Sequence, residues 1–325
     1  MIDFLNSLKR LLISRYILIF ISFTIIFISP SVGQIDINID KIFDSNSLDY
    51  TIFWELRVPR VIAGFFVGGL LSISGLVFQT IFRNAMSSPY TLGVASGASF
   101  GVGFAIVFEM INLVWLFSFI GAISTVIIHL FIMIKIRQYD RDSMLLVGIA
   151  LSFFYSASLM IFLFLSDQKE SYMIMRFTMG SLDISSFNEL ISIVLVSLFT
   201  LFIVLFYRYE LKLLLTNKEY AYLKGVDIKR VSYTLLAVLS LGIGVVVAST
   251  GPIGFVGLIA PHIIKTLYKQ SADRLIIPIF FYGGLFLVMC DLVARSVGGS
   301  SDIPIGVVTS FLGGGVFIYL ILNRR

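Results

Sequence analysis

The chain has 325 residues, of which 58% are hydrophobic and 13% are charged, whereas soluble domains carry roughly 25% charged residues. The net charge is +5, and the chain contains one cysteine, Cys290, and two histidines, His129 and His262. This composition excludes an internal disulfide framework, a CxxC metal site and a histidine-rich metal cluster. It indicates one all-α polytopic membrane domain over residues 1–325, and we expect neither a bound metal nor a nucleic-acid partner.

Ten apolar stretches approach the length of about 20 residues that a transmembrane helix needs. We expect spans over residues 11–29, 61–82, 92–108, 111–134, 143–165, 189–207, 231–250, 253–268, 275–294 and 304–322. The third and eighth are short, so they are expected to be tilted, partly re-entrant or lined by protein. The basic residues before the first stretch and the small residues at 31–33 also allow a cleaved signal peptide. The length of the stretch favours an uncleaved span.

The lysines and arginines predict the orientation of these spans. Ten spans place both termini on one side of the membrane. With both termini in the cytoplasm, the inner side holds 18 of the 24 basic residues and the outer side holds 12 of the 19 acidic ones. Because cytoplasmic loops carry an excess of Lys and Arg, we expect a multi-pass protein with cytoplasmic termini.

The outer ends of two spans carry arginines. Arg57 and Arg60 flank Pro59, which suits the first turn of a helix because no amide is needed there. These two side chains either snorkel to lipid phosphates or form forked pairs with the carboxylates of an acidic partner. Arg295 follows Asp291 by four residues, so we expect an ion pair that shields Asp291 from lipid.

The one long cytoplasmic segment covers residues 208–230. Thr216 and Glu219 form a capping-box pattern, in which the Thr hydroxyl accepts from the Glu amide and the Glu side chain reaches back. A short helix is expected to follow and to end at Gly225, which suits a left-handed C-terminal cap. This helix is either a docking element or an amphipathic helix that rests on the lipid headgroups.

Glycines and prolines are concentrated in the segment 251–262, GPIGFVGLIAPH. Pro261 predicts a kink and His262 an interfacial side chain, while His129 is expected to be hydrogen-bonded within the packing. Small residues also cluster at 64–69, 93–103 and 313–315, where close helix packing or a functional role is open. Breaks at 84–89 and 300–304 predict loops, with Pro304 as a structural residue.

Catalytic motifs are missing from the sequence. It contains no HExxH, no GxSxG and no Gly-Lys dipeptide, and therefore no Walker A loop. We expect no catalytic residue, no enzyme activity and no cofactor bound by this chain. If ATP drives its activity, ATP and Mg²⁺ are bound by a separate ATPase chain.

Several motifs occur together in an order that resembles the FecCD-type permeases, the membrane subunits of ABC importers for iron-siderophores, haem and vitamin B12. The resemblance covers roughly residues 50–325. It rests on LRVPR (56–60), SGLVFQTIFRN (74–84), SPYTLGVASGASFG (88–101), MGSL (179–182), YLKGVDIKR (222–230), GPIGFVGLIAPHI (251–263), DLVAR (291–295) and DIPIGVVTSFLGGGVFIYLI (302–321). The chain departs from the family at residues 84–87, at Asp302, where Glu is more usual, and at Gly314 and Gly315.

The resemblance implies a type II ABC importer permease fold with ten spans and both termini inside. It implies two permeases around a central path, two ATPase subunits below and an extracytoplasmic substrate-binding protein above. The path is expected near spans five, eight and ten and near a short outer helix within residues 171–180. The site residues it implies are Arg57, Arg60 and Arg295 for docking of the binding protein, Thr216, Glu219, Tyr220, Ala221, Leu223, Gly225 and Val226 for ATPase coupling, and Met179, Gly180 and Ser181 for the outer gate.

We therefore expect a permease subunit of an ATP-driven importer for a ferric siderophore or a related metal chelate, haem or cobalamin, in the bacterial cytoplasmic membrane. The alternative is a secondary transporter driven by an ion gradient. That class needs ionisable residues near the middle of the bilayer, and the predicted spans contain almost none. A polytopic membrane enzyme is disfavoured by the missing catalytic set. The sequence leaves the chelate open, and it allows either a homodimer or a pair of related permeases.

Overall fold

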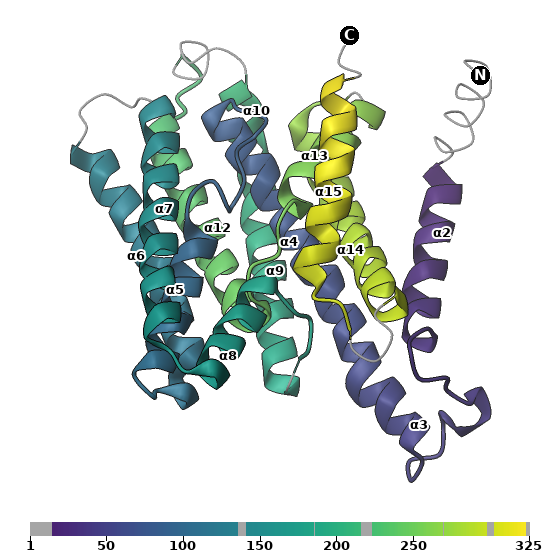
Figure 1. The fold of residues 1–325 in the computed structure, drawn as a ribbon. Coiled ribbons are helices and arrows are strands. Elements are labelled where there is room, and N and C mark those ends of the chain that lie inside the picture. The colour runs from purple at the N-terminus through teal and green to yellow at the C-terminus, as the bar shows by residue number, and fades with distance from the viewer. Residues whose placement is uncertain are drawn as a thin grey trace.

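The computed structural model describes residues 15–135, 141–184, 186–215, 223–268, 270–297 and 302–322, and the regular elements in these ranges are all helices. Figure 1 shows the long helices side by side, with α2 beginning and α15 ending at the end of the bundle where α10 lies. The expected all-α fold is confirmed for these residues. The side of a membrane that this end faces stays a prediction.

Each predicted span coincides with one helix. These helices are α2 (Arg15–Ile28), α4 (Val58–Phe82), α5 (Val94–Val107), α6 (Val114–Lys135), α7 (Arg141–Leu165), α9 (Phe187–Phe206), α12 (Ile228–Thr250), α13 (Val256–Tyr268), α14 (Ala272–Val297) and α15 (Ile305–Leu322). Within the described residues, 6 helices are long and apolar enough to cross a membrane, and four further apolar helices are shorter. The count of ten spans therefore stays a prediction.

The third and eighth predicted spans are short helices in the structure. α5 has 14 residues and α13 has 13. At about 1.5 Å per residue each rises only about 20 Å, well short of the hydrocarbon core of roughly 30 Å. Other helices cover both. α6 and α7 pack on α5, whereas α4 and α14 pack on α13. Of the alternatives for a short span, the structure favours one lined by protein.

The remaining elements are short and lie at the ends of the bundle. They are η1 (Ser29–Ser31), η2 (Ile39–Lys41), α3 (Leu48–Tyr50), η3 (Thr51–Arg57), η4 (Ile111–Leu113), α8 (Gln168–Met179) and α10 (Arg208–Leu215). α8 confirms the short helix expected within residues 171–180, although it begins three residues earlier. It lies across the end of the bundle opposite α10 (Figure 1).

The start of the second span differs from the prediction. Pro59 is the second residue of α4 and lies in its first turn, as expected. Helical structure nevertheless begins earlier, because it runs from Leu48 through η3 into α4, a stretch of 35 residues. η3 is a widened turn, in which the amide of Val58 donates to the carbonyl of Phe53 five residues earlier. A proline lacks the amide donor and crowds the carbonyl four residues before it. The wide turn accommodates both defects, and it carries Arg57.

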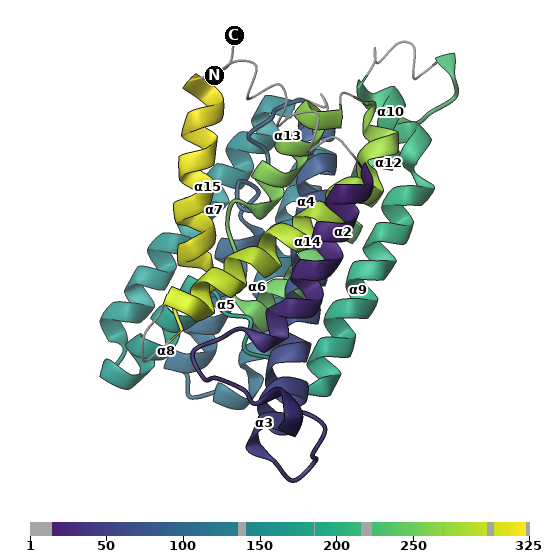
Figure 2. The same cartoon turned by 90° about the vertical axis from the view of Figure 1, so that its right-hand side faces the viewer.

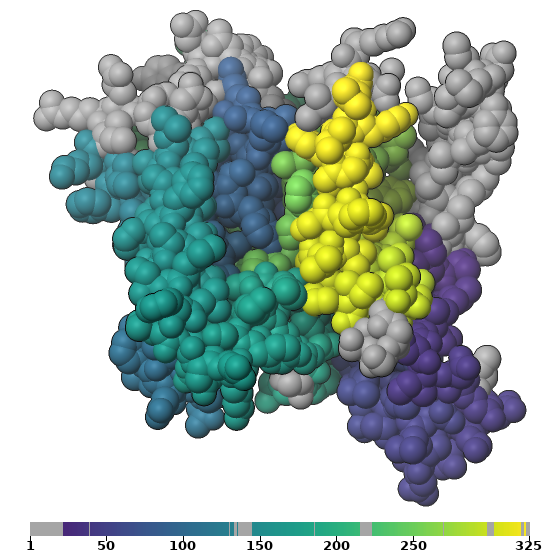
Figure 3. Space-filling view, in the orientation of Figure 1, coloured from purple at the N-terminus to yellow at the C-terminus, as the bar shows by residue number. Residues whose placement is uncertain are grey.

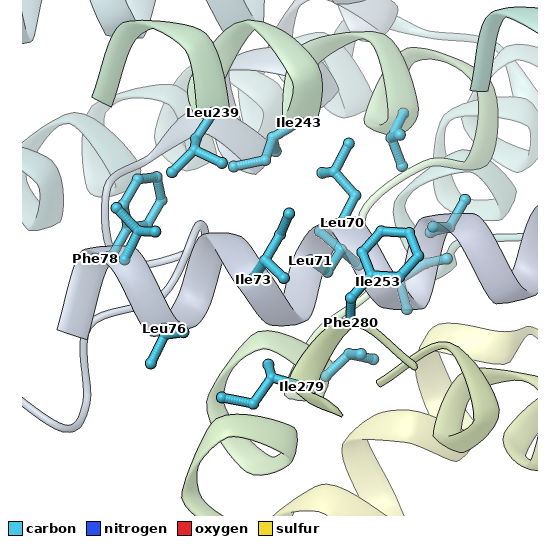
Figure 4. Close-up of a cluster of buried hydrophobic side chains, with 14 of the residues drawn as sticks. Leu70, Leu71, Ile73, Leu76, Phe78, Leu239, Ile243, Ile253, Ile279 and Phe280 are labelled. Atoms are coloured by element: carbon cyan, nitrogen blue, oxygen red, sulfur yellow. The ribbon is translucent and has the colours of Figure 1, made fainter. Parts of the chain in front are cut away.

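α4 is the central helix of the bundle. Its side chains pack on α12 on one side and on α14 on the other (Figure 4). The labelled core residues are Leu70, Leu71, Ile73, Leu76 and Phe78 of α4, Leu239 and Ile243 of α12, Ile253, and Ile279 and Phe280 of α14. Since lipid tails are as apolar as leucine, van der Waals contact and not transfer from water holds such helices together.

Two of the three small-residue clusters mediate close packing. Gly97 and Gly101 of α5 lie against the backbone of α6 at Gly121 and Phe117, and Gly68 of α4 lies against Gly283 of α14. The third cluster behaves differently. Gly313 packs on Phe255, whereas a Cβ at Gly314 or Gly315 would meet nothing within 4 Å. The packing interpretation is thus confirmed for residues 64–69 and 93–103.

Candidate functional site

Residues Met179, Gly180 and Ser181, the predicted outer gate, form the turn at the end of α8. We keep the name outer gate for this turn, and its gating role stays a prediction. α8 begins at an N-cap, Asp167, whose side chain accepts from the amide of Glu170, while the amide of Asp167 donates to the Glu170 side chain. Gly180 ends the helix with a φ of 73°, and the amide of Ser181 donates to the carbonyl of Thr250 at 2.7 Å. The gate is therefore fixed to the C-terminal end of α12.

The first turn of α15 closes the gate from the other side. A Cβ at Gly306 would overlap the carbonyl oxygen of Met179, and one at Gly180 would lie 2.7 Å from the carbonyl oxygen of Pro252. Glycine is required at both positions because the backbones touch. The turn after α8, the segment after α12 and the start of α15 consequently meet in one backbone contact.

Two cavities meet at the outer gate. One, of about 620 Å³, has a mainly apolar wall made by α8, α13, α15, the loop before α5 and the segment between α12 and α13. Its lining residues are Ser88, Tyr90, Thr91, Thr178, Met179, Pro252, Gly254, Phe255, Leu258, Gly306, Val307 and Ser310. The other, of about 490 Å³, lies on the far side of Met179 and is lined by Arg60, Arg176, Asp183 and Asp302 among others. Figure 3 shows the recess above α8, between α7 and α15. Met179 borders both cavities, so it separates an apolar chamber from a charged mouth.

Arg60 is the centre of an ion-pair network in the charged mouth. Its Nε lies 2.8 Å from Asp291 Oδ1, and its Nη1 lies 3.0 Å from Asp183 Oδ1 and 2.6 Å from Asp302 Oδ2. The Arg60 side chain is 12% exposed. The expected pair between Asp291 and Arg295 is present, with 2.9 Å between Asp291 Oδ2 and Arg295 Nε. One arginine thus joins α4, α14 and the two loop segments on either side of the gate.

Arg57 and Arg295 are buried, with 7% and 4% of their surface exposed. Arg57 donates to the carbonyls of Pro30 and Ile35, and Arg295 donates to the carbonyls of Ser29 and Val32. Neither guanidinium snorkels towards a lipid headgroup in this conformation. Both hold the segment after α2 against the outer ends of α4 and α14, and their docking role stays a prediction.

Part of the expected coupling segment lies outside the described residues. Thr216, Glu219, Tyr220 and Ala221 are among residues 216–222, and the predicted capping box falls there. Leu223, Gly225 and Val226 are described. Gly225 has a φ of 77°, as expected for a left-handed helix end, and α12 then begins at the N-cap Asp227, which accepts from the amides of Lys229 and Arg230. The coupling role of these residues stays a prediction.

The inner end of α4 touches both the coupling segment and α13. Arg83 donates to the carbonyl of Leu214, the next-to-last residue of α10, at 3.0 Å. Gln79, one turn earlier, accepts from Lys265 of α13 at 3.1 Å. α13 lines the apolar chamber with Leu258 and begins next to the gate. α4 is therefore in contact with both ends of the molecule.

The four expected structural residues are placed as follows. Pro261 is buried inside α13, and the carbonyl of His262 accepts from the Thr266 hydroxyl at 2.9 Å. Pro304 precedes α15 and accepts from the amide of Val307 at 3.0 Å. Asp291 is 1% exposed and held by Arg60 and Arg295. For His129, the expected hydrogen bond is present, between Nδ1 and the carbonyl of Thr125 at 3.0 Å.

Sequence reasoning missed Asp183 as a partner of Arg60 and treated Asp302 only as a departure from the family pattern. Both lie just outside apolar spans on the same face as Arg60, which is the signal that could have connected them. The capping box at Asp167 and Glu170 was also missed. The spacing Asp-x-x-Glu before an apolar run predicts it directly.

Comparisons with known proteins identify the family of the chain. The FecCD transport family matches residues 18–323. The chain belongs to this family. It is 32% identical over 310 residues to the hemin transport system permease protein HmuU of Yersinia pestis, covering 91% of each chain. It is also 32% identical to the vitamin B12 import system permease protein BtuC of Vibrio cholerae, covering 86% of this chain and 85% of that one.

A solved structure has the same fold. A metal-chelate type ABC transporter in an inward-facing conformation matches with a TM-score of 0.85 and 25% sequence identity, covering 95% of this chain and 98% of that one. The protein is thus an ABC permease, a multi-pass membrane protein and not an enzyme, and ATP hydrolysis belongs to a separate ATPase. The turn at Met179 lies between two cavities, and the transport path expected there stays a prediction.

Proposed function

We propose that this permease is the membrane subunit of an ATP-driven importer for a ferric siderophore or a related metal chelate such as haem or cobalamin. The observation that carries the proposal is the position of the outer gate. It separates an apolar chamber of about 620 Å³ from the charged mouth. A large, weakly held ligand suits a chamber with an apolar wall, because strong fixed contacts would keep it from leaving.

The relatives named above act on different ligands, hemin in one case and vitamin B12 in another. What these ligands share with ferric siderophores is size and a chelated metal, and not a common charged group. The chamber wall is made of aromatic, aliphatic and hydroxyl side chains, including Tyr90, Phe255 and Ser310. Such a wall suits a large chelate in general, and it does not distinguish a ferric siderophore from haem or cobalamin.

The alternative, transport driven by an ion gradient, has little support among the described residues. That mechanism needs ionisable groups near the middle of the membrane. The ionised residues of the long helices lie instead near the helix ends, Arg60 and Asp291 in the charged mouth and Lys265 near the inner end of α13. ATP hydrolysis by partner chains is the energy source that we propose.

A second permease copy is part of this proposal. The apolar chamber is lined by residues of α8, α13 and α15, and Phe311 of α15 is 82% exposed. A partner permease, identical or related, would close the chamber into a central path. We further propose that two ATPase subunits bind near the segment 208–230 and that an extracytoplasmic substrate-binding protein docks at the charged mouth, in a bacterial cytoplasmic membrane.

The test is uptake into vesicles that hold the permease with its ATPase. Uptake of the chelate delivered by the binding protein should require ATP and should survive a protonophore. An ATPase without its catalytic glutamate is the matched control and should stop uptake. Uptake that continues without ATP and collapses with the proton gradient would reject the proposal in favour of a secondary transporter. Binding of ferric siderophores, haemin and cobalamin to the binding protein then identifies the substrate.

A further inference from the structure

Two exposed aspartates share one nitrogen atom of Arg60. Asp183 and Asp302 both bind Nη1, at 3.0 and 2.6 Å, whereas Asp291 binds Nε on another edge of the guanidinium. The carboxylates differ in their surroundings. The Asp291 side chain is 1% exposed and is also paired with Arg295, while Asp183 and Asp302 are 49% and 37% exposed. The Nη1 edge is therefore the part of Arg60 whose partners water can reach.

The two exposed aspartates belong to the segments that close the outer gate. Asp183 follows Ser181 by two residues, and the Asp183 amide donates to the Ser181 hydroxyl at 3.0 Å. Asp302 lies four residues before Gly306, and the backbone of Gly306 lies against Met179. Arg60 belongs to α4, and its Nε is held by Asp291 of α14. If the gate opens by separation of the segment after α8 from the start of α15, the two aspartates move apart. At least one of the two hydrogen bonds to Arg60 Nη1 must then break.

Arg60 and its two exposed aspartates border two cavities. The charged mouth of about 490 Å³ is lined by Arg60, Asp183 and Asp302, and a separate cavity of about 360 Å³ is lined by the same three residues together with Arg57 and Arg295. A carboxylate that enters either cavity therefore approaches Arg60 next to the two aspartates that hold its Nη1. Because a guanidinium recognises carboxylates through its N–H edges, an incoming carboxylate competes with Asp183 and Asp302 for the same edge.

We propose that Asp183 and Asp302 occupy the position on Arg60 that a carboxylate of the docking protein takes, so that docking and closure of the gate compete for one guanidinium. This inference rests on the proposed docking of an acidic binding protein. A ligand shifts a conformational equilibrium only through its differential affinity for the two states, and the exchange of carboxylates on Nη1 supplies that difference. The partner it fits presents a carboxylate to the charged mouth, and the two aspartates keep the gate closed until that carboxylate arrives.

The proposal predicts that removal of two acidic side chains tightens binding of an acidic partner. The variant is Asp183→Asn with Asp302→Asn, in the permease–ATPase complex in nanodiscs, and the measurement is the Kd of the ligand-free binding protein. Exposed ion pairs contribute little, so we expect docking to become roughly two- to tenfold tighter. ATPase activity without the binding protein should also rise. The matched control is Asp40→Asn with Asp44→Asn, which removes the same charge from an exposed outer loop.

The outcomes separate this inference from the docking proposal on which it rests. If Arg60→Ala binds as tightly as wild type, the docking role of Arg60 fails. If Arg60→Ala weakens docking while the double Asp→Asn variant binds no more tightly than its control, only the competition is overturned. Weaker binding by the double variant also overturns it, since the aspartates would then belong to the docking surface. The single Asp183→Asn and Asp302→Asn variants keep the test decisive if the double variant does not fold, and each should tighten docking by a smaller factor.

Discussion

At the scale of single residues, small side chains determine how closely the helices approach. Gly101 of α5 lies directly on the backbone of α6, where a Cβ would overlap the carbonyl of Phe117, whereas a Cβ at Gly315 of α15 would meet nothing within 4 Å. Glycine is therefore required for packing at position 101, whereas position 315 has room for a larger side chain within this chain. The sequence pattern alone does not distinguish them.

Alanine substitutions at these two glycines should have opposite effects on stability. Gly101→Ala forces α5 and α6 apart, and overpacking of this kind costs about 1–3 kcal/mol. Gly315→Ala adds a side chain in open space and improves helix propensity by up to about 1 kcal/mol. Thermal unfolding of the purified permease in detergent checks both. Equal midpoints for the two variants would contradict the close contact of α5 with α6.

At the scale of elements, the turn after α8 and the first turn of α15 are in backbone contact at the proposed outer gate. Gly306→Ala should hold them apart, because its Cβ would overlap the carbonyl of Met179. The Thr178 side chain lines the chamber behind the gate. In a Cys290→Ser background, a cysteine introduced by Thr178→Cys should react faster with an external membrane-impermeant maleimide when Gly306→Ala is present. Gly315→Ala on the same helix is the control, and unchanged labelling in Gly306→Ala would show that this contact does not close the gate.

The coupling segment offers a second prediction at this scale. Gly225 has a φ of 77° and no atom within 4 Å of a Cβ placed on it, so only its backbone conformation restricts substitution. A β-branched residue is strongly disfavoured there, with a cost of roughly 1–2 kcal/mol, whereas asparagine tolerates this region. Gly225→Val should therefore reduce uptake per ATP hydrolysed, and Gly225→Asn should not. Wild-type coupling in Gly225→Val would remove this segment from the proposed ATPase contact.

At the scale of the whole molecule, the proposed dimer places the outer gate of one copy near that of the other. The chamber opens on the side of α8 and α15, while α9 lies on the opposite side of the bundle (Figure 2). In a Cys290→Ser background, Ser181→Cys should cross-link between two copies and block uptake until a reductant is added. Ser192→Cys on α9 should not cross-link. The reverse pattern would require a different dimer face.

The sequence by itself determined the helices and their approximate bounds, because long apolar runs and local caps act over a few residues. It also determined the pair of Asp291 with Arg295, since a spacing of four residues places two side chains on one helix face. The short helices α5 and α13 and the left-handed Gly225 were predicted for the same local reasons.

Only the tertiary structure decided what the outer arginines bind. Arg295 donates hydrogen bonds to the carbonyls of Ser29 and Val32, more than 260 residues earlier in the chain. Arg60 donates to three aspartates, one on α14 and two in separate loops. It also decided that the helix before Pro59 extends back to Leu48 through a wide turn. These features depend on which helix ends the packing brings together, and no spacing along the chain encodes that choice.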